Sequence, residues 1–173
     1  DIILEPAPVQ QPHPPLWLAA GRPESLQYAA RERYNLFLDQ FQTLEVIFER
    51  LRIFRDALAE TGRTYDPLGV GVARGLMIAD TDTAREAAIA QRIKQLEVMN
   101  SFGQAADGKG KSSMVSDSDL RKAAVDGVLL GTPDAIIERL KLMEAEGVGY
   151  VLLSSRDQES LRRFARDVMP AFA

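Results

Sequence analysis

Short segments that are apolar on both faces alternate with segments of helical periodicity, and this alternation limits the fold more than any other feature. The strand candidates are residues 15–20, 35–39, 68–80 and 150–155. Strands buried on both faces and separated by helices indicate a parallel sheet covered by helices. We therefore expect one α/β unit over residues 1–173, either an open doubly wound sheet or part of a (β/α) barrel, since a complete barrel has eight strands and ~250 residues.

The helices expected between and after these strands have recognisable ends. Thr83 and Glu86, three residues apart, form a capping box that predicts the start of the third helix, and Gly147 predicts the end of a later one. The segment 127–133, "GVLLGTP", is interpreted as a turn. Residues 100–116 are rich in glycine, serine and lysine and lack periodicity, which predicts a long flexible loop. The helices are expected at 24–33, 44–60, 84–99, 119–124, 134–147 and 159–172.

Composition and charge exclude several kinds of site. The chain has no cysteine, which removes disulfides, thiolate metal sites and cysteine nucleophiles and fits a cytoplasmic protein. Its 25 acidic and 21 basic residues give a net charge of -4 and no basic face for nucleic acid. Because no apolar run reaches the roughly 18 to 20 residues that cross a bilayer, we expect no membrane partner either.

The segment 16–25, "LWLAAGRPES", turns sharply from a strand into a helix. Pro23 suits the first helical position, which leaves the backbone amides of Glu24 and Ser25 free at a helix N-terminus of partial positive charge. These amides, the Ser25 hydroxyl and the Arg22 guanidinium could bind a phosphate. From spacing alone a capped helix without a ligand is favoured, and the Glu24 carboxylate opposes an anion unless it points away.

Other motifs have structural interpretations. Thr132 caps the helix of "GTPDAIIERL". His13 is the only histidine, so neither a zinc site nor a Ser-His-Asp triad is expected, and it is predicted to pack beside Trp17. Asp80 and Asp82 could bind magnesium or act as an acid and base, but their position favours a role at a helix start.

Three polar residues accompany the apolar strands. Asp39 and Gln40 end the second strand and would face the same side of the sheet as Gly21. Asp39 could orient a ligand hydroxyl or cap the next helix. Arg74 interrupts the third strand. Pointing into a barrel it could meet a phosphate or carboxylate, whereas pointing outwards, the commoner arrangement, it would extend between the helices towards solvent.

Three motifs in a fixed order resemble one known family. They are "QQPHPPLWLAAGRPESLQYAARERYNLFLDQF", "VGVARGLMIADT" and "GTPDAIIERLKLMEAEGVGYVLLS". Together they resemble the carboxyl-terminal half of the bacterial luciferase-like monooxygenases, which are flavin- or deazaflavin-dependent barrel enzymes. The resemblance covers almost the whole chain except the glycine-lysine loop. It implies a partial (β/α)8 TIM barrel in which the four strand candidates correspond to strands 5 to 8.

The resemblance also implies a cofactor and its site. It assigns the flavin phosphate to Gly21, Arg22 and Ser25, and places Asp39 and Gln40 near the cofactor. The cofactor would be FMN, or alternatively the deazaflavin F420, and the intact enzyme would act on a small organic substrate as a monooxygenase or by hydride transfer. No catalytic residue is assigned, because strands 1 to 4 of the family carry much of the flavin-ring and substrate site.

The resemblance to half a barrel leaves two functions open. The chain either forms part of such an enzyme and is inactive alone, or it is a non-catalytic half-barrel module that self-associates or pairs with another chain. Unpaired strands of a buried type need a covering partner, so a homo-oligomer or completion by the missing half is expected. An aldolase-type phosphate-binding barrel is a weaker alternative, because no lysine lies at a strand end to form a Schiff base.

Overall fold

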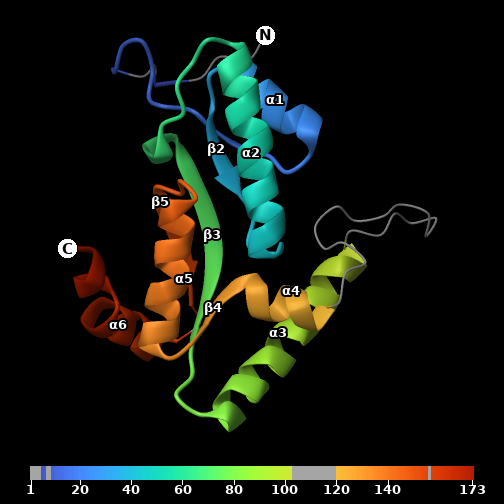
Figure 1. Cartoon of the computed structure of the whole chain (residues 1–173), viewed down its shortest axis with the longest axis vertical. Coiled ribbons are helices and arrows are strands. Elements are labelled where there is room, and N and C mark those ends of the chain that lie inside the picture. The colour runs from blue at the N-terminus through green and yellow to red at the C-terminus, as the bar shows by residue number, and fades with distance from the viewer. Residues whose placement is uncertain (1–4, 7–8, 103–119, 156) are drawn as a thin grey trace.

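The computed structural model describes residues 5–6, 9–102, 120–155 and 157–173. These residues form one parallel sheet of five strands with helices between them, as Figure 1 shows. The strands are β1 (Trp17–Ala19), β2 (Asn35–Leu38), β3 (Val70–Ile78), β4 (Val128–Gly131) and β5 (Tyr150–Ser154). The α-helices are α1 (Pro23–Arg31), α2 (Leu44–Glu60), α3 (Asp82–Phe102), α4 (Leu120–Asp126), α5 (Pro133–Ala145) and α6 (Gln158–Asp167), and 3-10 turns cover Pro67–Gly69 (η1) and Met169–Phe172 (η2).

Strand β3 is the centre of the sheet. It pairs with β5 over residues 71–75, with β2 over 70–72 and with β4 over 75–78, all in parallel. Because the β5 register overlaps the other two, β5 must occupy one edge of β3, while β2 and β4 share the opposite edge. Strand β1 continues the sheet beyond β2.

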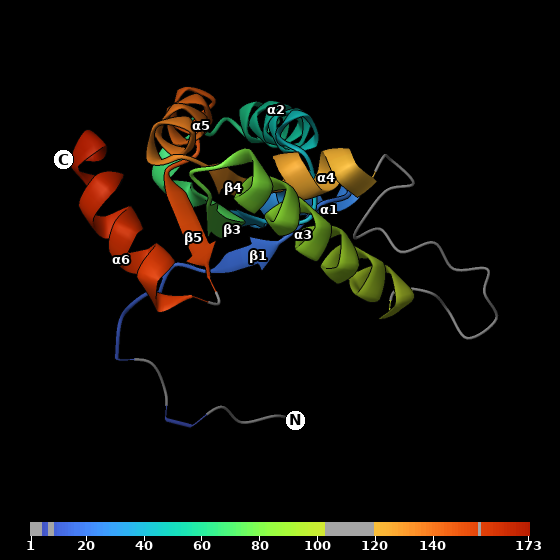
Figure 2. The same ribbon diagram turned by 90° about the horizontal axis from the view of Figure 1, so that it is seen from below.

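The main helices pack against one face of this sheet. Leu36, Val70 and Val72 are fully buried in a core that also contains Leu26 of α1 and Ile136 of α5. Figure 2 shows α2 and α5 together on that side, with α3 and α6 flanking the sheet. A doubly wound sheet has helices on both faces, whereas a barrel wall has them only outside. The arrangement therefore corresponds to a partial barrel.

The expected elements are found, with three corrections, the first being that the closing helix expected over 159–172 ends at Asp167 and is followed by the 3-10 turn η2. Residues 128–131 form strand β4 and not a turn, because their backbone pairs with Gly75–Ile78. Helix α3 starts at Asp82, and Thr81 accepts a hydrogen bond from the Ala84 amide at 3.2 Å, so the capping box at Thr83 is wrong. Helix α3 also includes residues 100–102, and residues 103–116 of the expected loop lie outside the described part.

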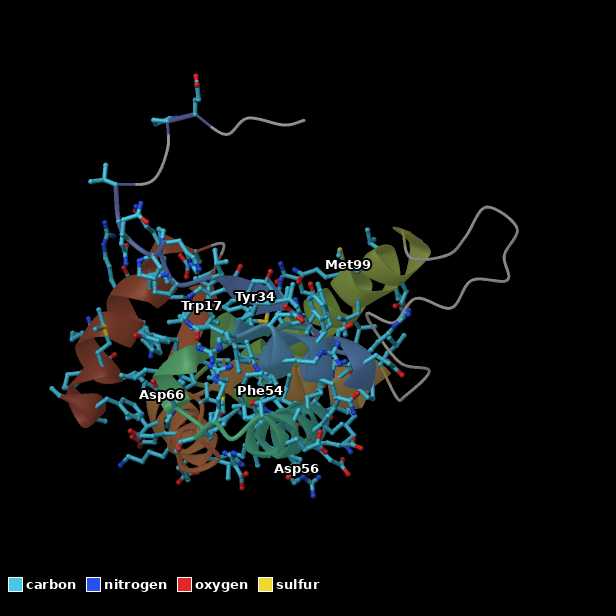
Figure 3. All side chains as sticks on the ribbon, turned by 90° about the horizontal axis from the view of Figure 1, so that it is seen from above. Trp17, Tyr34, Phe54, Asp56, Asp66 and Met99 are labelled. Atoms are coloured by element: carbon cyan, nitrogen blue, oxygen red, sulfur yellow. The ribbon has the colours of Figure 1, made fainter. Side chains whose placement is uncertain are left out.

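The sheet face opposite the helices carries exposed apolar side chains. Trp17 is 41% exposed, Tyr150 50% and Leu152 59%, and the rings of Trp17 and Tyr150 meet edge to face at 5.9 Å. Figure 3 shows Trp17 on the side away from α2, the helix that carries Phe54. This face corresponds to the interior of a complete barrel. None of the described helices combines the length and apolar character needed to cross a membrane.

Candidate functional site

An open cavity of about 550 Å³ lies at the carboxyl ends of β1 and β2. All five residues expected to bind a cofactor line it: Gly21, Arg22, Ser25, Asp39 and Gln40. They come together because neighbouring parallel strands end at the same edge of a sheet, where ligands bind in α/β folds. The other lining residues are Ala19, Ala20, Phe37, Phe41, Arg50 and Ala73.

Helix α1 presents uncapped amides to this cavity. Pro23 is its first residue, and the Arg22 side chain at the N-cap makes no capping hydrogen bond. The first backbone bond of the helix runs from the Leu26 amide to the Arg22 carbonyl at 3.0 Å, so the amides of Glu24 and Ser25 have no helical acceptor. The Glu24 side chain is exposed and does not line the cavity, which removes its objection to an anion.

Asp39 fixes the loop after β2. Its Oδ1 accepts the amide of Phe41 at 2.7 Å and that of Gln42 at 3.1 Å. Helix α2 has a different cap, because Thr43 Oγ1 accepts the Val46 amide at 3.4 Å. The alternative in which Asp39 caps that helix is therefore wrong. The second carboxylate oxygen of Asp39, Oδ2, accepts a hydrogen bond from Arg50 at 2.5 Å.

Arg50 is a cavity residue that the sequence did not assign to the site. Its guanidinium crosses from α2 to Gly21, where a Cβ would lie 3.0 Å from the Arg50 Cζ. The side chain is only 11% exposed and pairs with Asp39. The available signal was a charge within an apolar helical stripe, since Ile47, Leu51 and Phe54 on the same helix are buried.

Arg74 lies behind the cavity wall and not inside it. It shares the face of β3 with Val72 and Leu76, so it points towards the helices. An outward-pointing Arg74 was expected to reach solvent, but the side chain is completely buried. Its NH1 donates to the Asp39 carbonyl at 3.0 Å, while Nε and NH2 have no acceptor within the described residues. Burial lowers the pKa of Arg74 to about 10. Arg74 thus supports the backbone of Asp39.

Gln40 connects this cavity to two others of about 300 and 490 Å³. Its carbonyl accepts a hydrogen bond from Arg92 NH2 at 2.7 Å, which ties α3 to the end of β2. The additional lining is mixed; its polar members include Gln91 and Gln95 of α3 and Ser154 of β5, and its apolar members include Met77 and Met99. A continuous row of hollows therefore follows the carboxyl ends of the strands.

The remaining candidates lie outside this row. Thr132 accepts the Ala135 amide at 3.4 Å, which confirms its capping role. His13 is exposed, with Nδ1 2.8 Å from the Pro14 carbonyl oxygen. Asp80 accepts two hydrogen bonds from Arg163, each of 2.9 Å, and this contact lowers its pKa, while Asp82 begins α3. No group of three or more metal-ligating side chains occurs among the described residues.

The chemistry of the cavity suits a phosphate group. The guanidinium groups of Arg22 and Arg50, the Ser25 hydroxyl and the two amides without a helical acceptor supply hydrogen-bond donors. Gly21 has no side chain to fill the space between the loop and the Arg50 guanidinium. Charge-assisted hydrogen bonds from arginine to phosphate are among the strongest in proteins. One carboxylate, Asp39, is already paired.

Comparisons with known proteins identify the family of the chain. The family model described as luciferase-like monooxygenase matches residues 1–149. The chain belongs to this family. It is 29% identical, over 87% of its length, to an FMNH(2)-dependent dimethylsulfone monooxygenase of Pseudomonas fluorescens (strain Pf0-1). The chain spans about half the length of the curated relatives it matches.

Solved structures of other proteins share the fold. The oxygenating constituent of 3,6-diketocamphane monooxygenase from Pseudomonas putida, in complex with FMN, has a TM-score of 0.64 at 20% identity, over 92% of this chain and 49% of that one. The coenzyme F420-dependent tetrahydromethanopterin reductase of Methanopyrus kandleri has a TM-score of 0.59 at 19% identity, over 92% of this chain and 51% of that one.

Proposed function

We propose that this chain supplies the cofactor-phosphate half of a flavin-dependent oxidoreductase in which Gly21, Arg22 and Ser25 hold the phosphate of FMN. The single observation that carries the proposal is the cavity that brings these residues together with Asp39 and Gln40. The deazaflavin F420, which also carries a phosphate group, is the alternative cofactor. We place the protein in the cytoplasm, in keeping with its lack of cysteine.

In this proposal the flavin supplies the redox chemistry, which is oxygenation of a small organic substrate with reduced FMN and O2 or hydride transfer with F420. The chain's own residues bind and orient. The amides of Glu24 and Ser25 and the Arg22 guanidinium hold the anionic end, and Asp39 keeps the adjoining loop in place. The hollows at Gln40 extend from that end along the sheet.

The cofactor assignment predicts binding that depends on Arg22. Anaerobic titration of the full-length protein should show saturable binding of reduced FMN, and Arg22→Gln should weaken it about tenfold, since a charge-assisted hydrogen bond contributes about 1.5–3 kcal/mol. Arg31→Gln, at the other end of α1 and exposed, is the matched control and should leave affinity unchanged. Failure of both reduced FMN and F420 to bind would contradict the proposal.

A second candidate, a half barrel that pairs with itself, is favoured by the exposed side chains Trp17, Tyr150 and Leu152. Exposed apolar patches mark interaction surfaces. A protein of these 173 residues should therefore elute as a dimer of the 19.1 kDa chain in size exclusion with light scattering. Leu152→Glu should yield monomers, whereas Leu142→Glu, at an exposed position on helix α5, should not. A folded, strictly monomeric parent chain would rule out self-pairing.

A further inference from the structure

We propose that Arg50 is the second phosphate-binding cation of the cavity and the residue on which selection of a phosphorylated flavin mainly depends. The inference rests on the proposed function and deepens it. Arg50 belongs to helix α2, far from the "GRPES" loop in sequence, yet its guanidinium lies against that loop. A Cβ built on Gly21 would be 3.0 Å from Cζ, 3.1 Å from NH2 and 3.2 Å from NH1 of Arg50.

The environment of Arg50 orients its guanidinium in advance. Asp39 Oδ2 accepts from NH1 at 2.5 Å, while Asp39 itself is held by the amides of Phe41 and Gln42. A guanidinium has five N–H donors in a fixed plane, and every hydrogen bond that Arg50 forms within the described residues goes to Asp39. Its other donors therefore remain available to a ligand in the cavity that Arg50 lines.

Because Arg50 is more buried than Arg22, it should interact more strongly with a phosphate. Arg22 is exposed, so water screens its charge, whereas the Arg50 side chain is only 11% exposed. A charge in a partly buried site interacts more strongly with a ligand than one in water. With Arg22, Arg50 and Asp39 as its charged lining, the cavity carries one net positive charge, which complements a phosphate monoester.

The test compares FMN with riboflavin, which has the same ring system but no phosphate. In the full-length protein, reduced FMN should bind at least tenfold more tightly than reduced riboflavin. Arg50→Gln should weaken FMN binding more than the tenfold expected for Arg22→Gln and leave riboflavin binding unchanged. Arg52→Gln, on an exposed position two residues along the same helix, is the matched control and should change neither.

Two further variants separate binding from folding. Asp39→Asn combined with Arg50→Gln removes both charges of the pair, so no unpaired charge remains, and it should show the same selective loss of FMN affinity. Gly21→Ala should displace the guanidinium tip with little effect on the melting temperature, because a flexible side-chain end can move. It should also weaken FMN binding and spare riboflavin.

The outcomes distinguish the two proposals. Tight FMN binding that Arg50→Gln leaves intact, or an equal loss of FMN and riboflavin affinity, would overturn the role of Arg50 while the phosphate cavity stands. A parent protein that binds FMN and riboflavin equally well would overturn the phosphate cavity and the role of Arg50 together.

Discussion

Replacing Arg74 by methionine should make the protein more stable, by about 2 kcal/mol in the free energy of unfolding at neutral pH. Arg74 is completely buried, and two of its guanidinium nitrogens have no acceptor within the described residues. Burying a charge without an ion-pair partner costs free energy that an apolar side chain of similar volume does not cost, and replacing buried ion pairs by apolar residues is often neutral or stabilising by about 1–4 kcal/mol. Chemical denaturation of both proteins measures the difference. Arg74→Lys keeps the charge and should bring no gain.

The pH dependence supplies an independent check. Burial lowers the pKa of Arg74 to about 10, well below the ordinary value of an arginine. The unfolded chain therefore holds its proton more tightly than the folded chain, and the cost of the buried charge is present in full below pH 10 and declines as the pH rises above 10. The advantage of Arg74→Met should consequently shrink above pH 10. An advantage that stays constant up to pH 11, or a methionine variant less stable than the parent, would contradict this account.

The same substitution, Arg74→Met, should reduce cofactor binding. Arg74 NH1 donates to the carbonyl of Asp39, whose side chain orients Arg50 in the cavity. Without that bond the end of β2 has more freedom, so we expect Arg74→Met to bind FMN a few-fold less tightly. A protein commonly retains a destabilising buried group where the group serves a binding site.

Gly149→Ala should be the most destabilising of the changes considered, by about 3 kcal/mol. A Cβ at Gly149 would overlap the backbone of η1, lying 2.5 Å from the Pro67 carbonyl carbon and 2.9 Å from the Leu68 nitrogen, as well as against the Pro67 oxygen. The backbone cannot move aside as a side chain can. Because the Gly149 amide also donates to Val70 at 3.2 Å, a shift here disturbs the register of β5 on β3. Overpacking of this kind typically costs about 1–3 kcal/mol and occasionally more.

Gly69→Ala is the matched control for this change. A Cβ at Gly69 would meet only the Asn35 side chain, at 3.2 Å from Oδ1, and that side chain can rotate. We expect less than about 1 kcal/mol of destabilisation, in line with ordinary surface substitutions. Denaturant midpoints of the two variants give the comparison, and equal midpoints would show that the contact with η1 is unimportant.

The sequence predicted the fold well where local signals and burial agree. The four strand candidates are apolar on both faces and correspond to β1, β2, β3 and β5. Strand β4 was missed because three apolar residues between two glycines resemble a turn, and only the pairing of this segment with β3 reveals the strand. The cap of α3 was misplaced by two residues because Thr81 and Thr83 are equally good caps. Which of the two threonines caps α3 depends on where β3 ends, and the periodicity of the sequence does not show that position.

The candidate site divides in a similar way. Gly21 and Asp39 follow successive parallel strands, so strand order alone brings them to one cavity, and the phosphate roles assigned to its residues remain a proposal. Arg50 could not be assigned from sequence, because a helical arginine beside apolar residues more often reaches solvent. The orientation of Arg74 was ambiguous for a related reason. The face of the sheet on which a strand residue lies follows from strand pairing, which only the three-dimensional structure provides.

The sharing of one β3 edge by β2 and β4 has a structural consequence. The amino-terminal part of that edge holds β2, beside the cavity, and the carboxyl-terminal part holds the strand that brings the chain back from α3 and α4. We therefore expect changes in the length of the segment between α3 and β4 to leave the pairing of β2 with β3 beside the cavity unchanged.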